Sequence, residues 1–414
     1  MSNVIKNIEV SRLFRVAPTT VTNWIEYASQ GKNDLKVAEL GKKILILDTL
    51  SNRRILKKLA EEAQKYKSKS SFKEIEPKTE LYKIFMEDQV IDIITNIEMY
   101  KEIPHKYVYF NGGAEAWNQY VKAVLKSDEP ITIKDTIKAL RFDQEYIYSL
   151  VKKYPKINVI DIGPGNAEPV KELLSFLHSK GILRKYIGID YSPEILNITE
   201  ENLKSWFGNK FLIETHIRDI TANSFKELVF KNTYLSGNDD VDCINLVLFL
   251  GSTIENQRQY DQSLNIIKNS IGSEDIFVLG QLLDTEQAKL ELSFISEDNT
   301  NNDNDIDLEK NVLRMLGIKD EYYSVERLFD EVEHARIIQI RLNVDIKIKI
   351  NTPSLKKNLN LKNKDKIIVF RHNHHKTFEI ISDMNQIGFD LLHTNITPEQ
   401  DHILAIFKVR TITV

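Results

Sequence analysis

The feature that most constrains this chain is a strand-like run that ends in two closely spaced glycines. Residues 158–162 are largely apolar and β-branched, which predicts a buried parallel strand. Gly163 and Gly165 follow, and glycine allows both a sharp turn and a close approach of a ligand to the backbone. Apolar residues at helical spacing then occupy residues 168–180. The order of strand, turn and helix predicts the start of an α/β fold.

A second predicted strand ends in a carboxylate. Residues 186–189 are again apolar, and Asp190 follows them directly. In nucleotide-binding folds, a carboxylate at the tip of the second strand is placed to accept hydrogen bonds from a ribose diol. The two strands therefore predict a site for a nucleotide-like ligand, with Asp190 at its ribose.

The residues between these strands distinguish one nucleotide ligand from another. A dinucleotide fingerprint has a third glycine, and this chain has Glu168 there. Asp161 lies inside the D-x-G-x-G sequence, where its carboxylate would repel a pyrophosphate but suit the cationic methionyl part of S-adenosylmethionine. The stretch resembles motif I of class I methyltransferases, which implies that Asp161, Gly163 and Gly165 lie near the methionyl group. An incidental strand–turn–helix is the alternative.

Composition sets broad limits on the class of protein. A chain of 414 residues suggests two or three domains, and its net charge of −4 gives no overall attraction to nucleic acid. Cys243 is the sole cysteine, which excludes an intrachain disulfide and a cluster of thiolate metal ligands. The sequence shows neither a signal peptide nor an apolar run of membrane-spanning length. We therefore expect a cytoplasmic protein with no membrane partner.

Strands and helices alternate regularly after about residue 154, which predicts a parallel sheet covered by helices. The clearest of these helices is predicted over residues 256–271, and a further helix over residues 378–387. A closing pair of strands resembles the end of the class I methyltransferase sheet, whose last strand is antiparallel. We therefore predict an α/β, Rossmann-like methyltransferase core made of residues 154–284 and 377–414. The remaining strands of this core are predicted over residues 211–217, 243–250, 276–282, 389–395 and 402–409.

A large insertion interrupts the predicted core at residues 285–376, and we expect it to form a substrate-side subdomain. Residues 336–350 alternate between apolar and polar, which predicts one long strand with one buried face, and residues 366–370 are its predicted partner. Residues 297–307 are rich in Asn and Asp and predict a loop. No glycine stands at the turn position of a calcium loop, so we expect no metal there.

The segment before the core, residues 67–153, is predicted to be a linker followed by a helical, aromatic substrate roof. Residues 67–73 are rich in Lys and Ser, as linkers are, and residues 81–99 are apolar at helical intervals. An ordinary core role is an equal alternative for the aromatic side chains of this segment. These aromatic residues are Tyr107, Tyr109 and Trp117.

Residues 1–66 predict a separate, positively charged unit, with 12 Lys and Arg against 7 Asp and Glu. Short helices are predicted over residues 9–14 and 19–27, then two strands around Gly41, then a helix over residues 53–66. The pattern resembles the winged helix-turn-helix of excisionase-type and MerR-type domains, which implies nucleic-acid binding. A packing or dimerisation module is the alternative. The candidate nucleic-acid contacts are Arg12, Arg15, Thr22, Asn23, Lys42 and Lys43.

The residues at the end of the fourth predicted core strand resemble a motif of one particular methyltransferase family. Residues 250–256 read L-G-S-T-I-E-N, which resembles the L-G-S-T-I-G-N segment of the histidine N-alpha-methyltransferases of the ergothioneine pathway. The resemblance covers roughly residues 100–410. It implies that Asn256 holds the amino-acid head of the acceptor, and we expect the roof tyrosine Tyr109 to help orient it. The same fold is expected to place Asp219 near the adenine amine and Leu248 at the cleft floor.

Two departures from that family bear on the methyl acceptor. Glu255 stands in place of a glycine, and His372 and His374 stand in place of the Glu and Ser that read the imidazole of histidine. We therefore predict that the acceptor is an amine-bearing small molecule or peptide other than free histidine. No carboxylate or cysteine completes a metal-ligand set beside these histidines, so we expect an exposed polar cluster, or one facing an acidic ligand.

Two other functions stay open at this point. A base methyltransferase is disfavoured because residues 249–252 lack the Asp/Asn-Pro-Pro-aromatic tetrad, and because Cys243 starts its strand, away from the cleft end. A catalytically inactive regulator that binds S-adenosylmethionine, docked by the winged helix, is the second. Transfer of a labelled methyl group to metabolites, to nucleic acid or to neither would distinguish the three.

Overall fold

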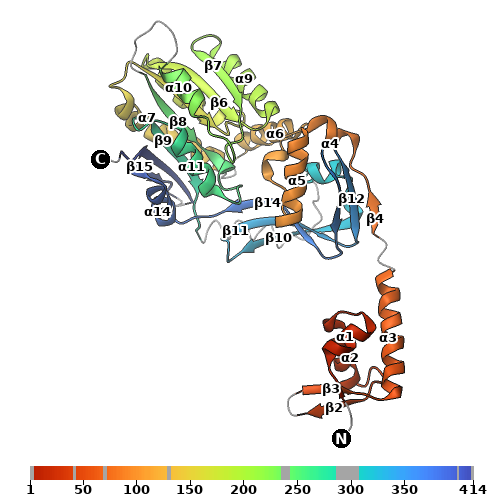
Figure 1. Cartoon of the computed structure of the whole chain (residues 1–414). Coiled ribbons are helices and arrows are strands. Elements are labelled where there is room, and N and C mark those ends of the chain that lie inside the picture. The colour runs from red at the N-terminus through yellow and green to blue at the C-terminus, as the bar shows by residue number, and fades with distance from the viewer. Residues whose placement is uncertain are drawn as a thin grey trace. The chain divides into compact units, whose positions relative to one another are not determined.

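The computed structural model describes residues 4–40, 43–68, 72–127, 132–234, 243–285, 307–398 and 401–411. The chain forms two compact units, Met1–Lys73 and Glu74–Val414 (Figure 1). None of the helices within the described ranges is long and apolar enough to cross a membrane.

The first unit combines three helices with a three-stranded antiparallel sheet in the order β1-β3-β2. Pro18 opens the second helix, where its missing N–H costs nothing. Val10, Val21, Trp24 and Leu56 are buried between the helices and the sheet. The elements are β1 (Val4–Ile5), α1 (Asn7–Phe14), α2 (Pro18–Ser29), β2 (Val37–Leu40), β3 (Lys43–Leu47) and α3 (Leu50–Ser68).

The second unit is built on a seven-stranded sheet in the order β15-β16-β9-β8-β5-β6-β7. The five neighbouring strands β9-β8-β5-β6-β7 are parallel, and β16 runs antiparallel to both of its neighbours. This confirms the Rossmann-like fold expected from the sequence. The strands are β5 (Lys156–Ile162), β6 (Leu183–Asp190), β7 (Leu212–Ile217), β8 (Cys243–Phe249), β9 (Ile276–Leu282), β15 (Phe389–Ile396) and β16 (His402–Val409).

Both faces of this sheet are covered by helices (Figure 1). Side chains alternate along each strand, so Val159 and Leu246 pack on one face while Ile160 and Val247 pack on the other. All four are fully buried, as expected for central parallel strands. One face packs against α7 (Thr132–Val151), α8 (Lys171–Ser179) and α9 (Pro193–Phe207), and the other against α10 (Lys226–Tyr234), α11 (Tyr260–Ser270) and α14 (Thr377–Ile387).

A third core joins the insertion to the helices that precede the sheet. Leu81 and Ile93 from those helices pack with Val312, Ile340 and Ile348 from the insertion. The preceding helices in this core are α4 (Thr79–Ile84) and α5 (Glu87–Tyr100), and α6 (Gly113–Lys126) follows them in the chain. The insertion contributes α13 (Lys310–Met315), β10 (Tyr323–Asp330), β11 (Ala335–Leu342), β12 (Ile346–Asn351), β13 (Lys356–Leu361) and β14 (Lys366–Asn373). They form two sheets, β10-β11-β14 and β13-β12-β4, where β4 is Lys73–Ile75.

The prediction of one long strand over residues 336–350 is wrong. The chain instead forms β11 and β12, which belong to different sheets. Asn343 turns the chain, with its backbone N–H donating to the Tyr322 carbonyl at 3.0 Å and its side chain donating to the Glu321 carbonyl. Leu342 and Ile346 are nevertheless both buried, so the apolar alternation continues through the turn and conceals it. The predicted partner strand is confirmed as β14, which pairs with β11.

Two predicted helices also differ in their bounds. The helical pattern over residues 81–99 is divided between α4 and α5, because Phe85 has an extended backbone and a buried side chain. The helix predicted from residue 256 begins at Tyr260, after a short 3₁₀ turn over Gly251–Thr253. The predicted Asn- and Asp-rich loop lies outside the described residues except for Asp307.

Candidate active site

One cavity of about 1290 Å³ lies at the carboxyl ends of the central parallel strands. Ligands of open α/β sheets bind at this edge. The cavity brings together all but one of the predicted cofactor and acceptor residues. Those on its wall are Tyr109, Asp161, Gly163, Gly165, Asp190, Asp219 and Asn256.

Leu248, expected at the cleft floor, does not line this cavity. Its side chain is fully buried and packs in the core with helices α7 and α8. Leu248 pairs with Asp161 inside the sheet, whereas Leu250 lies beyond the end of β8 and lines the cavity. We therefore move the cleft-floor assignment from Leu248 to Leu250.

The two glycines after β5 are required by the backbone and by their neighbours. Gly163 has a φ of +64°, and a Cβ there would lie 2.6 Å from the hydroxyl of Thr253. Gly165 has a φ of +58°, and a Cβ there would lie 3.3 Å from the Trp117 ring nitrogen. A side chain would therefore be strained at both positions. Because Thr253 belongs to the L-G-S-T segment, the structure packs the two sequence motifs against each other.

Asp161 and Asp190 form an acidic wall at the tips of adjacent strands. Burial raises the pKa of Asp161 to about 7, although its Oδ2 accepts a hydrogen bond from the Tyr186 hydroxyl at 2.7 Å. Burial likewise raises the pKa of Asp190 to about 6, against a hydrogen bond at 2.8 Å from the backbone N–H of Ser192. A cationic ligand would favour both ionised forms. The wall therefore fits a ligand that carries a cation beside a ribose diol.

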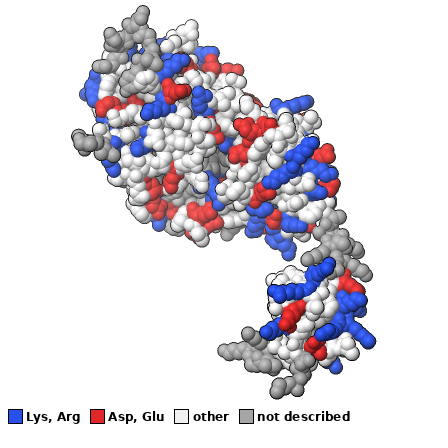
Figure 2. Space-filling view, viewed as in Figure 1, with Lys and Arg blue, Asp and Glu red and all other residues white. Residues whose placement is uncertain are grey.

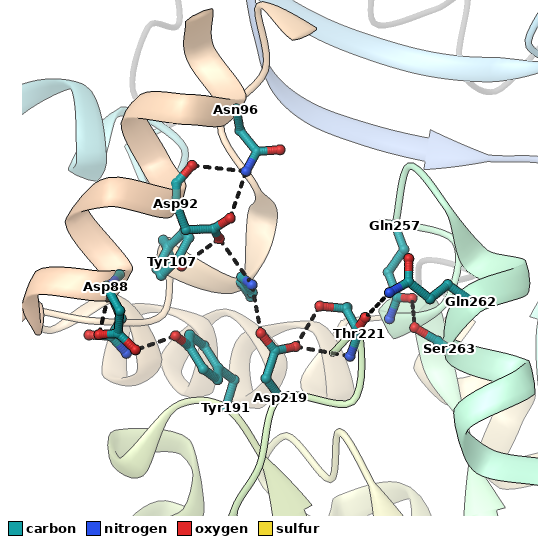
Figure 3. Close-up of polar contacts among 12 residues, drawn as sticks. Asp88, Asp92, Asn96, Tyr107, Tyr191, Asp219, Thr221, Gln257, Gln262 and Ser263 are labelled. Atoms are coloured by element: carbon teal, nitrogen blue, oxygen red, sulfur yellow. Dashed lines mark hydrogen bonds and ion pairs between the residues drawn. The ribbon is translucent and has the colours of Figure 1, made fainter. Parts of the chain in front are cut away.

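Asp219 is already engaged by a lysine that the sequence analysis did not single out. Its Oδ2 accepts from Lys106 Nζ at 2.8 Å, and its Oδ1 accepts from the Thr221 backbone N–H at 2.9 Å. Lys106 also lies 3.2 Å from Asp92, whose carboxylate accepts from the Tyr107 hydroxyl at 2.6 Å. Figure 3 shows this chain of contacts running from Asp92 to Thr221.

The paired lysine sets the charge state of Asp219. Burial by itself would raise the pKa of this carboxyl. The charge of Lys106, with hydrogen bonds from Lys106 and Thr221, outweighs burial and lowers it. Asp219 is therefore ionised at neutral pH and joins the sheet edge to the helical segment through Lys106.

Asn256 lines the same cavity and has an unpartnered acceptor atom. Its Nδ2 is 3.4 Å from His105 Nδ1, while its Oδ1 is buried and has no hydrogen-bond partner among the described residues. His105 Nε2 is buried and unpartnered in the same way. Burial lowers the pKa of His105 to about 4, so its imidazole is neutral at pH 7. Buried polar atoms are seldom left unpaired, so these two point to a ligand.

Tyr109 lies near both Asp190 and His105. Its ring meets His105 edge-on at a centroid distance of 5.3 Å and Trp117 at 6.2 Å. Burial raises the pKa of Tyr109, and the negative charges of Asp190 and Glu309 raise it further. The hydroxyl therefore stays protonated at neutral pH and is a hydrogen-bond donor facing the cavity.

One expectation placed His372 and His374 in an exposed cluster, but both side chains are buried. They are 6% and 3% exposed and line the cavity with Phe370. The three alternate along β14 and its end, so they share one face. Ring centroids are 5.2 Å apart for His105 and Phe370, 6.2 Å for Phe370 and His372, and 4.9 Å for His372 and His374. We call these four residues the ring wall.

Burial keeps the histidines of the ring wall neutral. It lowers the pKa of His372 well below its usual range and that of His374 to about 4, and the charge of Arg336 lowers both further. Among the described residues, no group of three or more His, Cys, Asp or Glu side chains is arranged to hold a metal ion. The ring wall is thus an aromatic surface with neutral hydrogen-bonding edges.

Glu255, which stands in place of a glycine, contacts residues at the ends of β9 and β14 and so supports the ring wall. It is fully buried, and its Oε1 accepts from the Leu282 backbone N–H at 2.6 Å. Its Oε2 lies 3.8 Å from His372 Nε2, and its carbonyl accepts from the Asn373 N–H at 2.8 Å. Burial raises the pKa of Glu255 well above its usual range. The residue therefore joins the ends of β9 and β14 beside Asn256.

Several cavity residues had no sequence signal. His105 and Lys106 lie in a segment without a motif, and Glu309 and Arg336 lie in the insertion. Their positions depend on how the insertion packs against the sheet edge. Only a family alignment of both segments could have singled them out from sequence.

The chain is similar to several solved methyltransferase structures. An S-adenosylmethionine-dependent methyltransferase from Clostridium acetobutylicum ATCC 824 is 10% identical, with 73% of this chain and 99% of that chain covered and a TM-score of 0.35. Magnesium protoporphyrin IX methyltransferase from Synechocystis PCC 6803, with bound S-adenosylhomocysteine, is 9% identical, with 72% and 96% covered and a TM-score of 0.37. Because these TM-scores are low, they carry no argument about function.

A third solved structure, 1,6-didemethyltoxoflavin-N1-methyltransferase from Burkholderia thailandensis, is 9% identical, with 74% of this chain and 91% of that chain covered and a TM-score of 0.36. No curated protein matches the chain in sequence. The family profile of histidine-specific, S-adenosylmethionine-dependent methyltransferases matches residues 86–409, which include every residue of the cavity described above. The chain therefore belongs to this family and is an S-adenosylmethionine-dependent methyltransferase.

Proposed function

We propose that this methyltransferase methylates the nitrogen of an amine-bearing small molecule or peptide other than free histidine. The observation that carries the proposal is the buried, unpartnered Oδ1 of Asn256, in one cavity with Asp161 and Asp190. An amide can accept from an amine and donate to a carboxylate, so it suits an amino-acid-like head.

The cofactor fits the acidic side of the cavity. Asp190 would accept from the ribose hydroxyls, and Asp161 with the turn at Gly163 and Gly165 would hold the methionyl part. Asp219, the proposed partner of the adenine amine, would share its carboxylate with Lys106. S-adenosylmethionine supplies a methyl group already activated by its sulfonium, so the protein has to align the nucleophile and exclude water.

An amine must lose a proton before it can act as a nucleophile. His105 is neutral and buried beside Asn256; because its Nδ1 accepts from the Asn256 amide, its unpartnered Nε2 carries the proton and can donate a hydrogen bond to the acceptor. With a pKa of about 4 it is too weak a base to take up the proton of the amine at neutral pH. We therefore assign His105, Asn256 and Tyr109 to orienting the amine.

Incubation of the full chain with S-adenosylmethionine, histidine and a panel of other primary amines, followed by mass spectrometry, tests the acceptor. We expect methylated products from members of the panel and none from histidine, because neutral His372 and His374 replace an acid and a hydroxyl. Efficient formation of trimethylated histidine would contradict the proposal.

We further propose that the first unit is a winged helix-turn-helix that binds nucleic acid. In support, Arg12, Arg15, Thr22 and Asn23 are all exposed on or beside α1 and α2. Figure 2 shows Lys and Arg side chains on the surface of this unit, and Arg54, Lys57 and Lys58 are exposed along α3. Lys42 and the side chain of Lys43 lie outside the described residues.

Salt dependence tests this second proposal. Binding of the full chain to duplex and to structured single-stranded probes should weaken steeply with salt. Replacing Arg12 and Arg15 with alanine should lower the salt slope by about 2, one for each lost phosphate contact. Lys204→Ala, on α9 of the second unit, serves as the control. Absent or salt-independent binding would favour a packing module.

A further inference from the structure

Two opposite charges on the wall of the cavity do not meet. Arg336 on β11 and Glu309 beside α13 both line the cavity. The charge of Arg336 lowers the pKa of Glu309, which burial raises, so each lies within the electrostatic reach of the other. Yet neither has an oppositely charged partner within 4.0 Å among the described residues, and Glu309 Oε2 is buried without a hydrogen-bond partner.

The other Lys and Arg side chains of the cavity differ in this respect. Lys106 is paired with two carboxylates, and Arg258 lies 3.3 Å from Glu102. Arg218 donates to the carbonyl of Ile217 at 2.8 Å. Within the described part of the chain, Arg336 is thus a cavity guanidinium with no protein acceptor to satisfy its donors. A partly buried guanidinium without a protein acceptor is a strong anion receptor.

The ring wall separates Arg336 from the proposed amine site. Asn256 contacts His105, and the row of rings continues through Phe370 to His372. Arg336 is the cross-strand partner of His372 in the β11–β14 ladder. A molecule whose amine lies at Asn256 can therefore extend along these rings and bring its far end to Arg336.

We propose that the methyl acceptor carries a carboxylate at the end remote from its amine, and that Arg336 binds this carboxylate. The inference rests on the proposed amine site at Asn256. The planar guanidinium can hold a carboxylate through two parallel hydrogen bonds. Glu309, on the same wall, opposes a second negative charge, so a monoanion fits beside Arg336 better than a dianionic phosphate. The unpartnered Glu309 Oε2 can accept a hydrogen bond from an N–H or O–H of the acceptor.

Matched pairs of a carboxylate and its amide provide the test. Aspartate and asparagine, glutamate and glutamine, 6-aminohexanoate and its amide, and 4-(aminomethyl)benzoate and its amide would be titrated by calorimetry. The protein is the full chain saturated with S-adenosylhomocysteine. We expect the carboxylate of at least one pair to bind about tenfold or more tightly than its amide, because the guanidinium distinguishes them by charge.

Variants locate the preference in one side chain. Arg336→Gln should reduce the preference for carboxylate over amide to less than about threefold. Arg336→Lys keeps the positive charge but not the two parallel N–H donors of the guanidinium, so it should retain part of this preference. Arg341→Gln is the matched control, since Arg341 lies on the same strand, is exposed and pairs with Glu326 at 3.4 Å. Unchanged affinity for S-adenosylhomocysteine would show that each variant is folded.

The outcomes separate this inference from the proposed function. Equal binding of carboxylate and amide in every pair, no measurable binding of any pair, or a preference that survives Arg336→Gln would overturn the assignment of Arg336. Mass spectrometry of the same panel with S-adenosylmethionine tests N-methylation independently. A carboxylate preference without any methylated product would uphold the Arg336 site and contradict the proposed amine chemistry.

Discussion

The side of the cavity proposed to bind the cofactor and the side proposed to bind the acceptor differ in charge and in origin. The cofactor side presents buried carboxylates at the tips of β5 and β6, whose pKa values are raised to about 7 and 6. The acceptor side presents neutral imidazoles, aromatic rings and the unpaired guanidinium of Arg336. The first side comes from one continuous stretch of chain, whereas the second is assembled from distant segments. The cofactor side is thus set by a local motif, and the acceptor side by tertiary packing.

Asn256→Ala is expected to have the largest effect. Removing the amide leaves an acceptor amine unoriented, so turnover should fall by about 100-fold or more, while cofactor affinity stays within about twofold. Calorimetry for the cofactor and mass spectrometry for the product measure the two separately. Asn265→Ala, an exposed asparagine on α11, is the control. An equal loss of cofactor affinity would place Asn256 on the cofactor side.

The pH dependence of cofactor binding should be the next largest effect. The unliganded pKa values of Asp161 and Asp190 are about 7 and 6, and a bound cation favours the ionised forms and lowers them. Protonation therefore competes with binding, and affinity should fall as pH drops below 7, by at most about tenfold per pH unit for each group. Calorimetry between pH 8 and pH 5 measures this. Asp161→Asn should flatten the profile, and a flat profile in the parent would refute the acidic wall.

Asp190→Ala should weaken cofactor binding by on the order of 1–3 kcal/mol, because a charge-assisted pair of hydrogen bonds to the ribose is lost. Titration calorimetry measures the change. Asp390→Ala, an exposed aspartate on β15 that pairs with Arg410, should leave affinity unchanged. Equal affinity in Asp190→Ala and the parent would remove Asp190 from the ribose site.

Lys106→Met should have the smallest effect of these changes, and its effect is on the stability of the fold. It leaves Asp92 and Asp219 without their shared cation, and the free energy of unfolding should fall by roughly 1–2 kcal/mol, since Asp92 is 38% exposed and partly screened. Urea unfolding of the full chain measures the loss. Lys204→Met, which breaks an exposed pair with Glu200 on α9, should cost less than about 0.5 kcal/mol. Equal losses would show that Lys106 is an ordinary surface lysine.

The amino-acid sequence by itself determined the sheet and most of the cofactor side. Apolar β-branched runs and glycine turns are local signals, and consecutive strand tips of a parallel sheet necessarily meet at one edge. Asp190 could therefore be assigned from its place at a strand tip, and Asp161, Gly163 and Gly165 from their resemblance to motif I of class I methyltransferases; all four line the cavity. The prediction that Leu248 lies at the cleft floor is wrong, because alternation predicts which face of the sheet a side chain is on but not how far along the strand it lies.

Only the tertiary structure decided the acceptor side. Alternation of apolar residues could not reveal the turn at Asn343, since Leu342 and Ile346 keep the same period across it. Whether His372 is exposed or buried depends on Glu255 and on the strand that carries Arg336. Burial and electrostatic pairing between residues far apart in the chain leave no periodic trace in the sequence. For that reason the cofactor could be predicted from the sequence, whereas Arg336 and Glu309 became visible only in the fold.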